Sequence, residues 1–284
     1  MIVWIASYPK SGNTWMRLFI KSYLNDSNKK FSLNNHIDDT VVIETFPTER
    51  KFDELKINYR DFNDIAKNWI NLHSLINLNN KINYLKTHNA MCTINHHKFT
   101  NIENTIGGIH IVRDPRDVLI SYSNYLNEHI DETLKTMLSD HSYEAGEFKN
   151  IIYKKSLMGS WSSHYNSWKK YKSRDTIIIK YEDMVCNTYD TFLRVLNYLN
   201  KLTNLEINET KMIDAIKQTS FENLKSLELT EGFKENPSTN PFFRNGKVGE
   251  WKKKLNKEQV QKIISDNTYS GLSAITQLNS YKRC

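Results

Sequence analysis

The fold of this chain is decided by the stretch Ile2-Val3-Trp4-Ile5-Ala6-Ser7-Tyr8-Pro9-Lys10-Ser11-Gly12-Asn13-Thr14-Trp15-Met16-Arg17. It begins with an apolar run rich in β-branched residues, which predicts a buried strand. Pro9 cannot donate to a strand ladder, so it ends the strand. Gly12 lets the backbone come close to a ligand. From about Asn13, apolar residues recur at helical spacing. The stretch therefore predicts a strand, a tight loop and the start of a helix.

A loop between a strand and a helix points unpaired backbone N–H groups and the positive end of the helix dipole at one place. Such a place binds phosphate or sulfate. Lys10 adds a full positive charge, and Ser11 and Thr14 add hydroxyl donors. The alternative is an ordinary turn whose polar residues only cap the helix, but Lys10 and Trp15 favour a nucleotide site. The nucleoside-triphosphate loop G-x-x-x-x-G-K-[ST] does not occur, and here the lysine precedes the glycine.

Composition narrows the class of protein. The chain has 284 residues, and 39 Lys and Arg against 32 Asp and Glu give a formal net charge of +7. This excess favours an anionic ligand but is not the density of a dedicated DNA-binding protein, so we expect no nucleic-acid partner. No secretory leader and no apolar run long enough for a bilayer are apparent. We therefore expect a soluble, cytoplasmic protein without stable membrane insertion.

Three cysteines are far apart and match neither a disulfide framework nor a metal pattern. Such usage favours a reducing compartment. They are Cys92, Cys186 and Cys284.

Strands and helices are predicted to alternate along the chain, which implies a parallel sheet with helices on both faces. Ligands in such folds bind beyond the carboxyl ends of the strands. Four polar residues lie at or just after predicted strand ends: Lys10, His88, Arg113 and Tyr181. After the opening strand, further strands are expected at 82–88, 108–115 and 176–181, and helices at 59–78, 118–126, 160–173, 188–200, 209–218 and 256–269.

Two polar segments lie outside this alternation. Residues 129–158 show no clear period, and we expect them to form a mobile flap. Residues 230–250 form a long loop with several Gly and Pro residues, and a loop of that length in a compact domain is usually functional.

The segment Tyr8-Pro9-Lys10-Ser11-Gly12, followed by Thr14 and Trp15, resembles the first signature of the sulfotransferases that use 3′-phosphoadenosine 5′-phosphosulfate (PAPS). Asn13 stands where the vertebrate cytosolic members carry threonine, but an amide still donates a hydrogen bond. The resemblance extends from about residue 2 to residue 255. It implies that this loop binds the cofactor through Lys10, Ser11, Gly12, Asn13, Thr14 and Trp15.

The resemblance also implies a fold. It predicts one α/β domain over residues 1–284, with three layers and a central parallel sheet flanked by helices, similar to that of the P-loop NTPases. Three segments match nothing in the family, and we expect them to build an acceptor pocket and its lid. They are residues 25–80, 128–158 and 228–241.

His88 ends the second predicted strand, and Lys86 projects to the same side of it. A histidine at such a place can act as a general base near neutral pH, although a lone histidine is more commonly structural. The segment Lys86-Thr87-His88 resembles the family's catalytic segment, which implies that His88 is the base. Lys10 and Lys86 would then stabilise charge on the sulfuryl and leaving phosphate oxygens.

A second family signature resembles Arg113-Asp114-Pro115-Arg116-Asp117-Val118, followed by Ser121. The resemblance implies that Arg113 and Ser121 hold the 3′-phosphate, and a guanidinium suits that contact. Alternatively, Arg113 could pair with Asp117 to tie the turn, but we expect Arg116 and Asp117 to do so. Further matches imply contacts with the adenine from Tyr181, Thr219 and Phe221.

The segment Phe242–Lys252 resembles the third signature, a loop that closes over the 3′-phosphate. The family usually carries a lysine where this chain has Asn245, so we expect weaker cofactor binding. The resemblance implies cofactor contacts from Phe243, Arg244, Asn245 and Gly246.

These motifs predict an enzyme that moves a sulfuryl group from PAPS to an acceptor hydroxyl, or less readily an amine, by in-line displacement without a metal. Adenosine 3′,5′-bisphosphate (PAP) would be released, and the acceptor would be a small molecule, a glycan or a lipid. One alternative is a kinase-like phosphotransferase, which would depend on magnesium. The other is a non-catalytic module that binds nucleic acid or another polyanion, with a steep salt dependence and no turnover.

Overall fold

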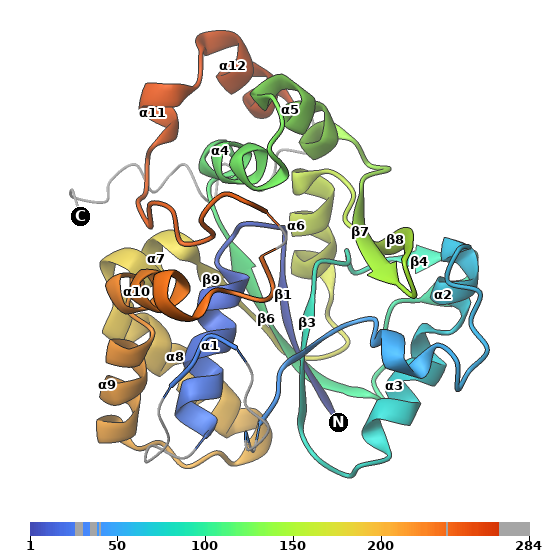
Figure 1. Cartoon of the computed structure of the whole chain (residues 1–284). Coiled ribbons are helices and arrows are strands. Elements are labelled where there is room, and N and C mark those ends of the chain that lie inside the picture. Colours follow the sequence, from blue (N-terminus) through green and yellow to red (C-terminus); the bar gives the residue numbers. More distant parts are fainter. Residues whose placement is uncertain (26–30, 35–38, 40, 237, 267–284) are drawn as a thin grey trace.

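The computed structural model describes residues 1–25, 31–34, 39, 41–236 and 238–266. At its centre is a sheet of five parallel strands in the order β2-β3-β1-β6-β9, with β1 in the middle (Figure 1). The strands are β1 (Ile2–Ser7), β2 (Glu44–Thr45), β3 (Asn83–Thr87), β6 (Thr105–Val112) and β9 (Thr176–Lys180). The parallel sheet predicted from the alternation of elements is confirmed.

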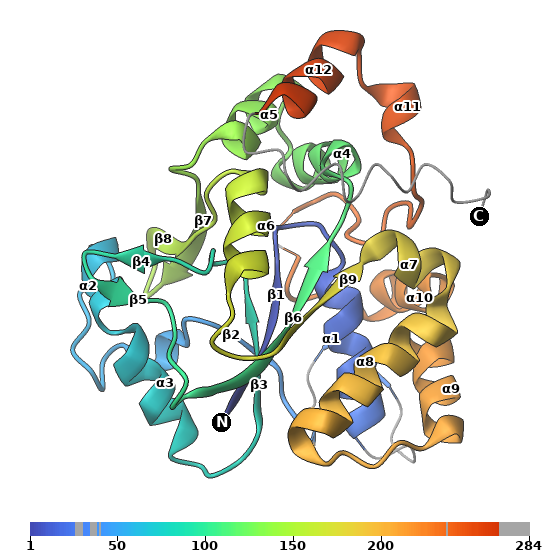
Figure 2. The ribbon, with the colours of Figure 1, turned by 180° about the vertical axis from the view of Figure 1, so that it is seen from behind.

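Helices cover both faces of this sheet (Figures 1 and 2). One face carries α1 (Asn13–Leu24), α8 (Thr188–Thr203) and α9 (Glu209–Gln218). The other carries α2 (Phe62–Lys67), α3 (Trp69–Asn77) and α6 (Trp161–Lys170). Further elements are η1 (Glu49–Lys51), α7 (Tyr181–Cys186), α10 (Phe221–Glu231) and the antiparallel pair β4 (Thr93–Ile94) and β5 (His97–Lys98).

The alternation of side chains along β1 explains why both faces are covered. Val3 and Ile5 pack into the apolar cluster shared with α1, α8 and α9. Trp4 and Ala6 pack into the cluster on the opposite face, with α2 and α3. Successive residues of a strand point to opposite faces, so a continuous apolar run requires an apolar partner on each side. The predicted buried strand is therefore the middle of the core.

A group of helices lies beyond the carboxyl ends of the strands (Figure 1). It comprises α4 (Pro115–Leu126), α5 (Ile130–Leu138), α11 (Trp251–Lys254) and α12 (Lys257–Ser265). Beside α6 stands an antiparallel hairpin of β7 (Tyr143–Phe148) and β8 (Ile151–Leu157). These elements surround the edge of the sheet where ligands of α/β folds bind.

Two sequence-based expectations about secondary structure are wrong. The helix predicted over 59–78 is two helices, because Asn68 ends α2 and begins α3. The aperiodic flap predicted over 129–158 is helix α5 followed by the β7–β8 hairpin. Few hairpin residues are fully buried, and apolar and polar residues do not alternate along either strand, so the strands lack the strand signal that burial of one face creates. The loop over 230–250 is confirmed within the described residues, between α10 and α11.

Cys92 is a free thiol, whereas Cys186 is disulfide-bonded. The expectation that no cysteine pairs is therefore wrong for Cys186, and Cys284 lies outside the described residues. Within the ranges given above, every helix is too short or too polar to cross a bilayer.

Candidate active site

The loop after β1 has the backbone shape that a close approach to an anion requires. Gly12 precedes α1 with a φ of 104°, and Lys10 also has a positive φ, of 64°. A Cβ atom on Gly12 would lie 2.7 Å from the ring of Tyr181. Glycine is thus required both by its backbone angle and by the ring beside it. The unpaired N–H groups at the start of α1 face this loop.

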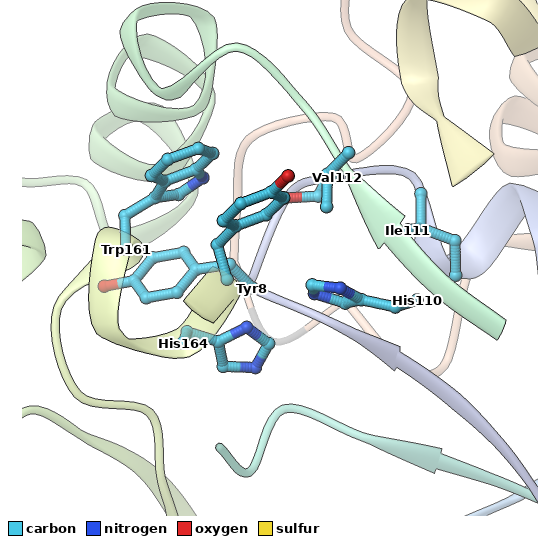
Figure 3. A pocket seen from close by; sticks show the side chains of 8 residues that line it. Tyr8, His110, Ile111, Val112, Trp161 and His164 are labelled. Carbon is cyan, nitrogen blue, oxygen red and sulfur yellow. The ribbon is translucent and has the colours of Figure 1, made fainter. Parts of the chain in front are cut away.

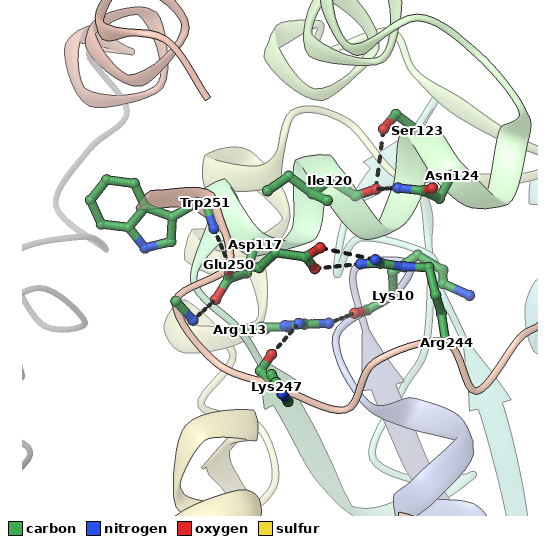
Figure 4. Close-up of polar contacts among 11 residues, drawn as sticks. Lys10, Arg113, Asp117, Ile120, Ser123, Asn124, Arg244, Lys247, Glu250 and Trp251 are labelled. Atoms are coloured by element: carbon green, nitrogen blue, oxygen red, sulfur yellow. Dashed lines mark hydrogen bonds and ion pairs between the residues drawn. The ribbon is translucent and has the colours of Figure 1, made fainter. Parts of the chain in front are cut away.

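Arg113 joins this loop to the loop before α11 (Figure 4). Its guanidinium donates hydrogen bonds of 3.2 Å to the main-chain oxygens of Lys10 and Lys247. Its plane lies over the ring of Tyr181, 4.3 Å from the centroid. The Nε–H of Arg113 has no partner among the described residues. The two predicted segments therefore meet at one guanidinium that keeps a donor for a ligand.

Asp117, in the first turn of α4, holds the loop before α11 through hydrogen bonds (Figure 4). Its carboxylate accepts hydrogen bonds from the backbone N–H groups of Gly249, at 2.6 Å, and Trp251, at 2.9 Å. Arg116 pairs instead with Asp114, at 2.6 Å. The expected pair between Arg116 and Asp117 is therefore wrong, because the backbone of a distant loop reaches Asp117.

Arg244 lies on the same loop and forms a two-pronged ion pair with Glu250 (Figure 4). Hydrogen bonds from Arg244, and more weakly from Asn245, hold the pKa of Glu250 below its usual value despite burial. Gly246 has a φ of 64°, and a Cβ there would lie 2.6 Å from the ring of Phe221. The loop thus lies directly on the start of α10.

The ammonium of Lys10 sits over two aromatic rings. It lies 3.6 Å from the centroid of Phe242 and 4.4 Å from that of Tyr125. Burial, together with the positive charges of Arg113 and Lys86, lowers the pKa of Lys10 to about 7. Aromatic faces attract a cation, but they do not neutralise it. The site therefore gathers positive groups that an anionic ligand would stabilise. Sequence reasoning had given neither ring a role beside Lys10.

His88 follows β3 directly, and its Nδ1 donates a 2.7 Å hydrogen bond to the main-chain oxygen of Ser7. Because a carbonyl oxygen can only accept, Nδ1 carries the proton and Nε2 keeps its lone pair. Burial, with the positive charge of Lys86, lowers the pKa of His88 to about 4. The imidazole is neutral at pH 7, which is the form that a general base requires.

Glu144, on β7, is a site residue that sequence reasoning missed. Its Oε2 is buried and has no hydrogen-bond partner among the described residues. Burial disfavours its charge, but electrostatic interactions with His88, Lys86 and Lys155 outweigh burial and lower the pKa of Glu144. No sequence signal separates Glu144 from Glu147, which is exposed on the same strand. Only the fold brings one of them to His88.

A small pocket lies behind the loop, between β1, β6 and α6 (Figure 3). It is lined by Tyr8, Ser11, His110 and His164 among others. Polar atoms of these four side chains are buried without partners in the described part of the chain. The Ser11 side chain therefore lines this pocket, and its hydroxyl is buried there.

The other predicted site residues lie around the same edge of the sheet. Asn13 donates to the main-chain oxygen of Ile5 at 3.0 Å and accepts from Arg17, so its amide holds the loop. Thr14 accepts a 3.4 Å hydrogen bond from Arg17. The Trp15 ring packs edge-on against Tyr181, with centroids 6.1 Å apart.

Three more predicted residues serve the packing of this region. Ser121 is half-buried on α4. Thr219 is buried and donates to the main-chain oxygen of Ala215 at 2.7 Å. Phe243 is buried in an apolar cluster with Leu18 and Phe233.

The residues present fit a nucleotide that carries several anionic groups. A Cβ at Gly12 would clash with Tyr181. Two lysines and two arginines converge on the loop: Lys10, Lys86, Arg113 and Arg244. Trp15 Nε1 and Arg113 Nε are buried donors without partners among the described residues. Within those same residues, no group of three or more His, Cys, Asp or Glu side chains could hold a metal ion.

Comparisons with known proteins identify relatives of this chain. The family model described as "Sulfotransferase domain" matches residues 2–270. Human Sulfotransferase 1C2 is 26% identical over 192 residues, an alignment that covers 62% of this chain. The alignment spans 58% of the human protein, less than two thirds of that protein's length. Flavonol 3-sulfotransferase of Flaveria bidentis is 24% identical over 278 residues, covering 92% of this chain and 78% of that protein.

Two solved structures share the fold. The mouse sulfotransferase SULT7A1 complexed with PAP superposes with a TM-score of 0.60 at 21% identity, covering 98% of this chain and 86% of that chain. Retinol dehydratase in complex with retinol and PAP superposes with a TM-score of 0.60 at 16% identity, covering 100% and 83%. The fold class expected from the sequence is confirmed.

Proposed function

Because the chain belongs to the sulfotransferase family, we propose that it transfers a sulfuryl group from PAPS to an acceptor hydroxyl or amine. The observation that carries the proposal is the gathering of positive groups around the loop after β1. Lys86, Arg113 and Arg244 are close enough to Lys10 to lower its pKa. Such mutual repulsion costs free energy that an anionic ligand recovers. A donor with a phosphosulfate and a 3′-phosphate matches a site of this charge.

Each segment of the site has a part in holding this donor. The N–H groups at the start of α1, with Lys10, face the phosphosulfate. Arg113 and Arg244, from α4's entry and the loop before α11, would bind the 3′-phosphate, with Ser121 beside them. The rings of Trp15, Tyr181 and Phe221 would contact the adenine. Two structures that share this fold hold PAP, which carries the adenine, the 3′-phosphate and the 5′-phosphate of this donor, and this supports the assignment.

His88 is proposed as the general base. Its Nε2 lone pair is free because Nδ1 donates to Ser7. As the acceptor oxygen forms its bond to sulfur, Nε2 takes the acceptor proton, and the bond from sulfur to the phosphate oxygen breaks with its electrons on PAP. Lys10 and Lys86 stabilise the negative charge that develops on the oxygens around sulfur. Positioning and electrostatics are the protein's contribution, as in phosphoryl transfer.

We place the acceptor on the side of His88 that faces the β7–β8 hairpin and the loop after α10. These elements belong to the segments 128–158 and 228–241, which match no family motif. Two relatives are named for small-molecule acceptors, a flavonol in Flaveria bidentis and luciferin in Photinus pyralis. A small-molecule acceptor is therefore the form of the proposal that we would test first.

The test is transfer of label from [35S]PAPS to a panel of phenols, aliphatic alcohols, sugars and primary amines in the presence of EDTA. We expect label on at least one class of acceptor and none with the His88→Ala variant. Tight binding of PAP without transfer to any class would contradict the proposal and favour a binding module. Magnesium-dependent transfer from [γ-32P]ATP would contradict it in favour of a kinase-like enzyme.

A further inference from the structure

The base His88 sits in surroundings that oppose its protonation. Burial and the neighbouring Lys86 both disfavour the imidazolium. A general base works by accepting a proton in the transition state, so the imidazolium must be stabilised at that moment. Some negative charge near His88 is therefore required by the proposed reaction.

The β7–β8 hairpin is fastened to the chain directly after His88. The backbone N–H of Leu157 donates to Asn89 Oδ1 at 2.8 Å, and the N–H of Ala90 donates to the oxygen of Leu157 at 2.8 Å. Leu157 pairs across the hairpin with Tyr143. These bonds fix the start of β7 relative to the base.

Glu144 stands at an irregularity in this hairpin. It pairs with Ser156, and the register then shifts between Glu144 and Ala145. Such bulges redirect a side chain and often occur next to active sites. The Glu144 side chain is turned inward far enough that Oε2 is buried, without a partner among the described residues. A buried carboxylate oxygen that accepts nothing is costly unless it meets a positive charge.

Two of the positive groups around this pair, Lys155 near Glu144 and Arg17 near His88, are occupied elsewhere. Lys155 pairs with Glu49 at 2.5 Å, and Arg17 pairs with Glu235 at 2.6 Å. Lys86 forms no ion pair with a described residue. The titratable and charged groups that face His88 are Lys86 on β3, Arg17 on α1, His164 on α6 and Glu144 on β7. Those that face Glu144 are His88, Lys86, Lys155, Tyr122, Tyr125 and Tyr153. Of the groups facing His88, Glu144 supplies the negative charge.

We propose that Glu144 is a positioning residue for the base, whose carboxylate stabilises the imidazolium that forms when His88 Nε2 takes the acceptor proton. The inference rests on the proposed function of this site. Glu144 neither accepts the proton nor touches the sulfuryl group. After transfer, the proton leaves His88 to solvent and the pair returns to a neutral imidazole beside a carboxylate.

Glu144→Gln tests the proposal, because it removes the charge and keeps the shape. We expect kcat to fall by roughly 10–100-fold, the range of a hydrogen bond or contact to a charged group. The KM for PAPS should change little. The acidic limb of the pH profile of kcat/KM should move to lower pH by about one unit, because His88 loses the charge that favours its protonation. Glu144→Asp should restore part of both effects, and Glu147→Gln, on the same strand but exposed, should behave as the wild type.

A second measurement is independent of turnover. Isotope-labelled His88 is titrated by NMR with PAP bound, in the wild type and in Glu144→Gln. The titration midpoint should move to lower pH in the variant. An unmoved midpoint and an unmoved pH limb in a folded variant would overturn the proposal, as would a loss confined to KM. If Glu144→Gln does not fold, Glu144→Asp is expected to show a smaller shift in the same direction. If the wild type transfers no sulfuryl group, the proposed function fails. The NMR titration still shows whether the Glu144 carboxylate stabilises the protonated form of His88.

Discussion

Arg113 donates a 3.2 Å hydrogen bond to the main-chain oxygen of Lys10, so the guanidinium predicted to hold a phosphate also shapes the loop that carries the site's lysine. The same group reaches Lys247 on the loop before α11. One side chain therefore joins the two loops.

Arg113→Lys should weaken binding of PAP by roughly 10–100-fold, because an ammonium cannot hold two carbonyls and a phosphate in one plane. Binding of AMP, which lacks the 3′-phosphate, should weaken much less. Calorimetry with both nucleotides measures the difference. Lys254→Ala, an exposed lysine on α11, is the matched control and should alter neither affinity. Equal losses for both nucleotides would show that Arg113 acts only on the loop and not on the 3′-phosphate.

The affinity for PAP should fall as the pH rises above 7. Lys10 has a pKa of about 7 in the resting protein, lowered first by burial and then by neighbouring positive charges. A bound anion favours its charged form, so binding takes up a proton in the window between pH 7 and the higher pKa of the complex. We expect affinity to fall by up to about tenfold per pH unit in that window. Calorimetry from pH 7 to 9 in buffers of different ionisation enthalpy measures both the affinity and the proton uptake.

Lys10→Met is the variant that isolates this effect, because it keeps the side-chain length over the rings of Phe242 and Tyr125 but carries no charge. Its affinity should be low and nearly independent of pH over the same window. A persisting proton uptake in Lys10→Met would assign the effect to another group.

His88→Ala should abolish turnover and leave PAP binding nearly unchanged. A general base contributes about 10²–10⁴-fold in rate. His88 contacts Ser7 behind the site rather than the proposed nucleotide pocket. Single-turnover kinetics with PAPS, alongside calorimetry with PAP, separates the two effects. His96→Ala, at an exposed position, should leave both unchanged. A collapse of PAP binding in His88→Ala would make this residue structural.

Gly12→Ala should cost more stability than Gly232→Ala, although both glycines have positive φ values of 104° and 68°. A Cβ at Gly12 meets the Tyr181 ring at 2.7 Å, whereas nothing lies within 4 Å of one at Gly232. The strain of these backbone angles alone costs about 1–3 kcal/mol at either site. The clash should add roughly 1–3 kcal/mol at Gly12. Chemical denaturation measures both variants, and equal losses would mean that the loop relaxes away from Tyr181.

Much of the architecture is readable from local pattern. The apolar run of β1 requires cover on both faces, and the residues that follow β1, β3, β6 and β9 lie at one edge of a parallel sheet. The sequence therefore predicts that four polar residues lie together at that edge: Lys10, His88, Arg113 and Tyr181. The division at Asn68 and the β7–β8 hairpin were not readable in this way. Neither produces a period, because apolar and polar residues do not alternate along the hairpin strands and the helix break depends on how α2 and α3 pack.

The chemistry of the residues follows from the chain, while their electrostatic state follows from the fold. A lysine beside a glycine before a helix indicates an anion site wherever it occurs, because that property depends on neighbours in sequence. Four properties of the site depend on residues that are distant along the chain. They are the pKa of Lys10 near 7, the tautomer of His88 set by Ser7, the contact of Arg113 with Lys247, and the burial of Glu144 near His88. Their values depend on desolvation and on the distances between charges, and these quantities exist only once the chain has closed around the edge of the sheet.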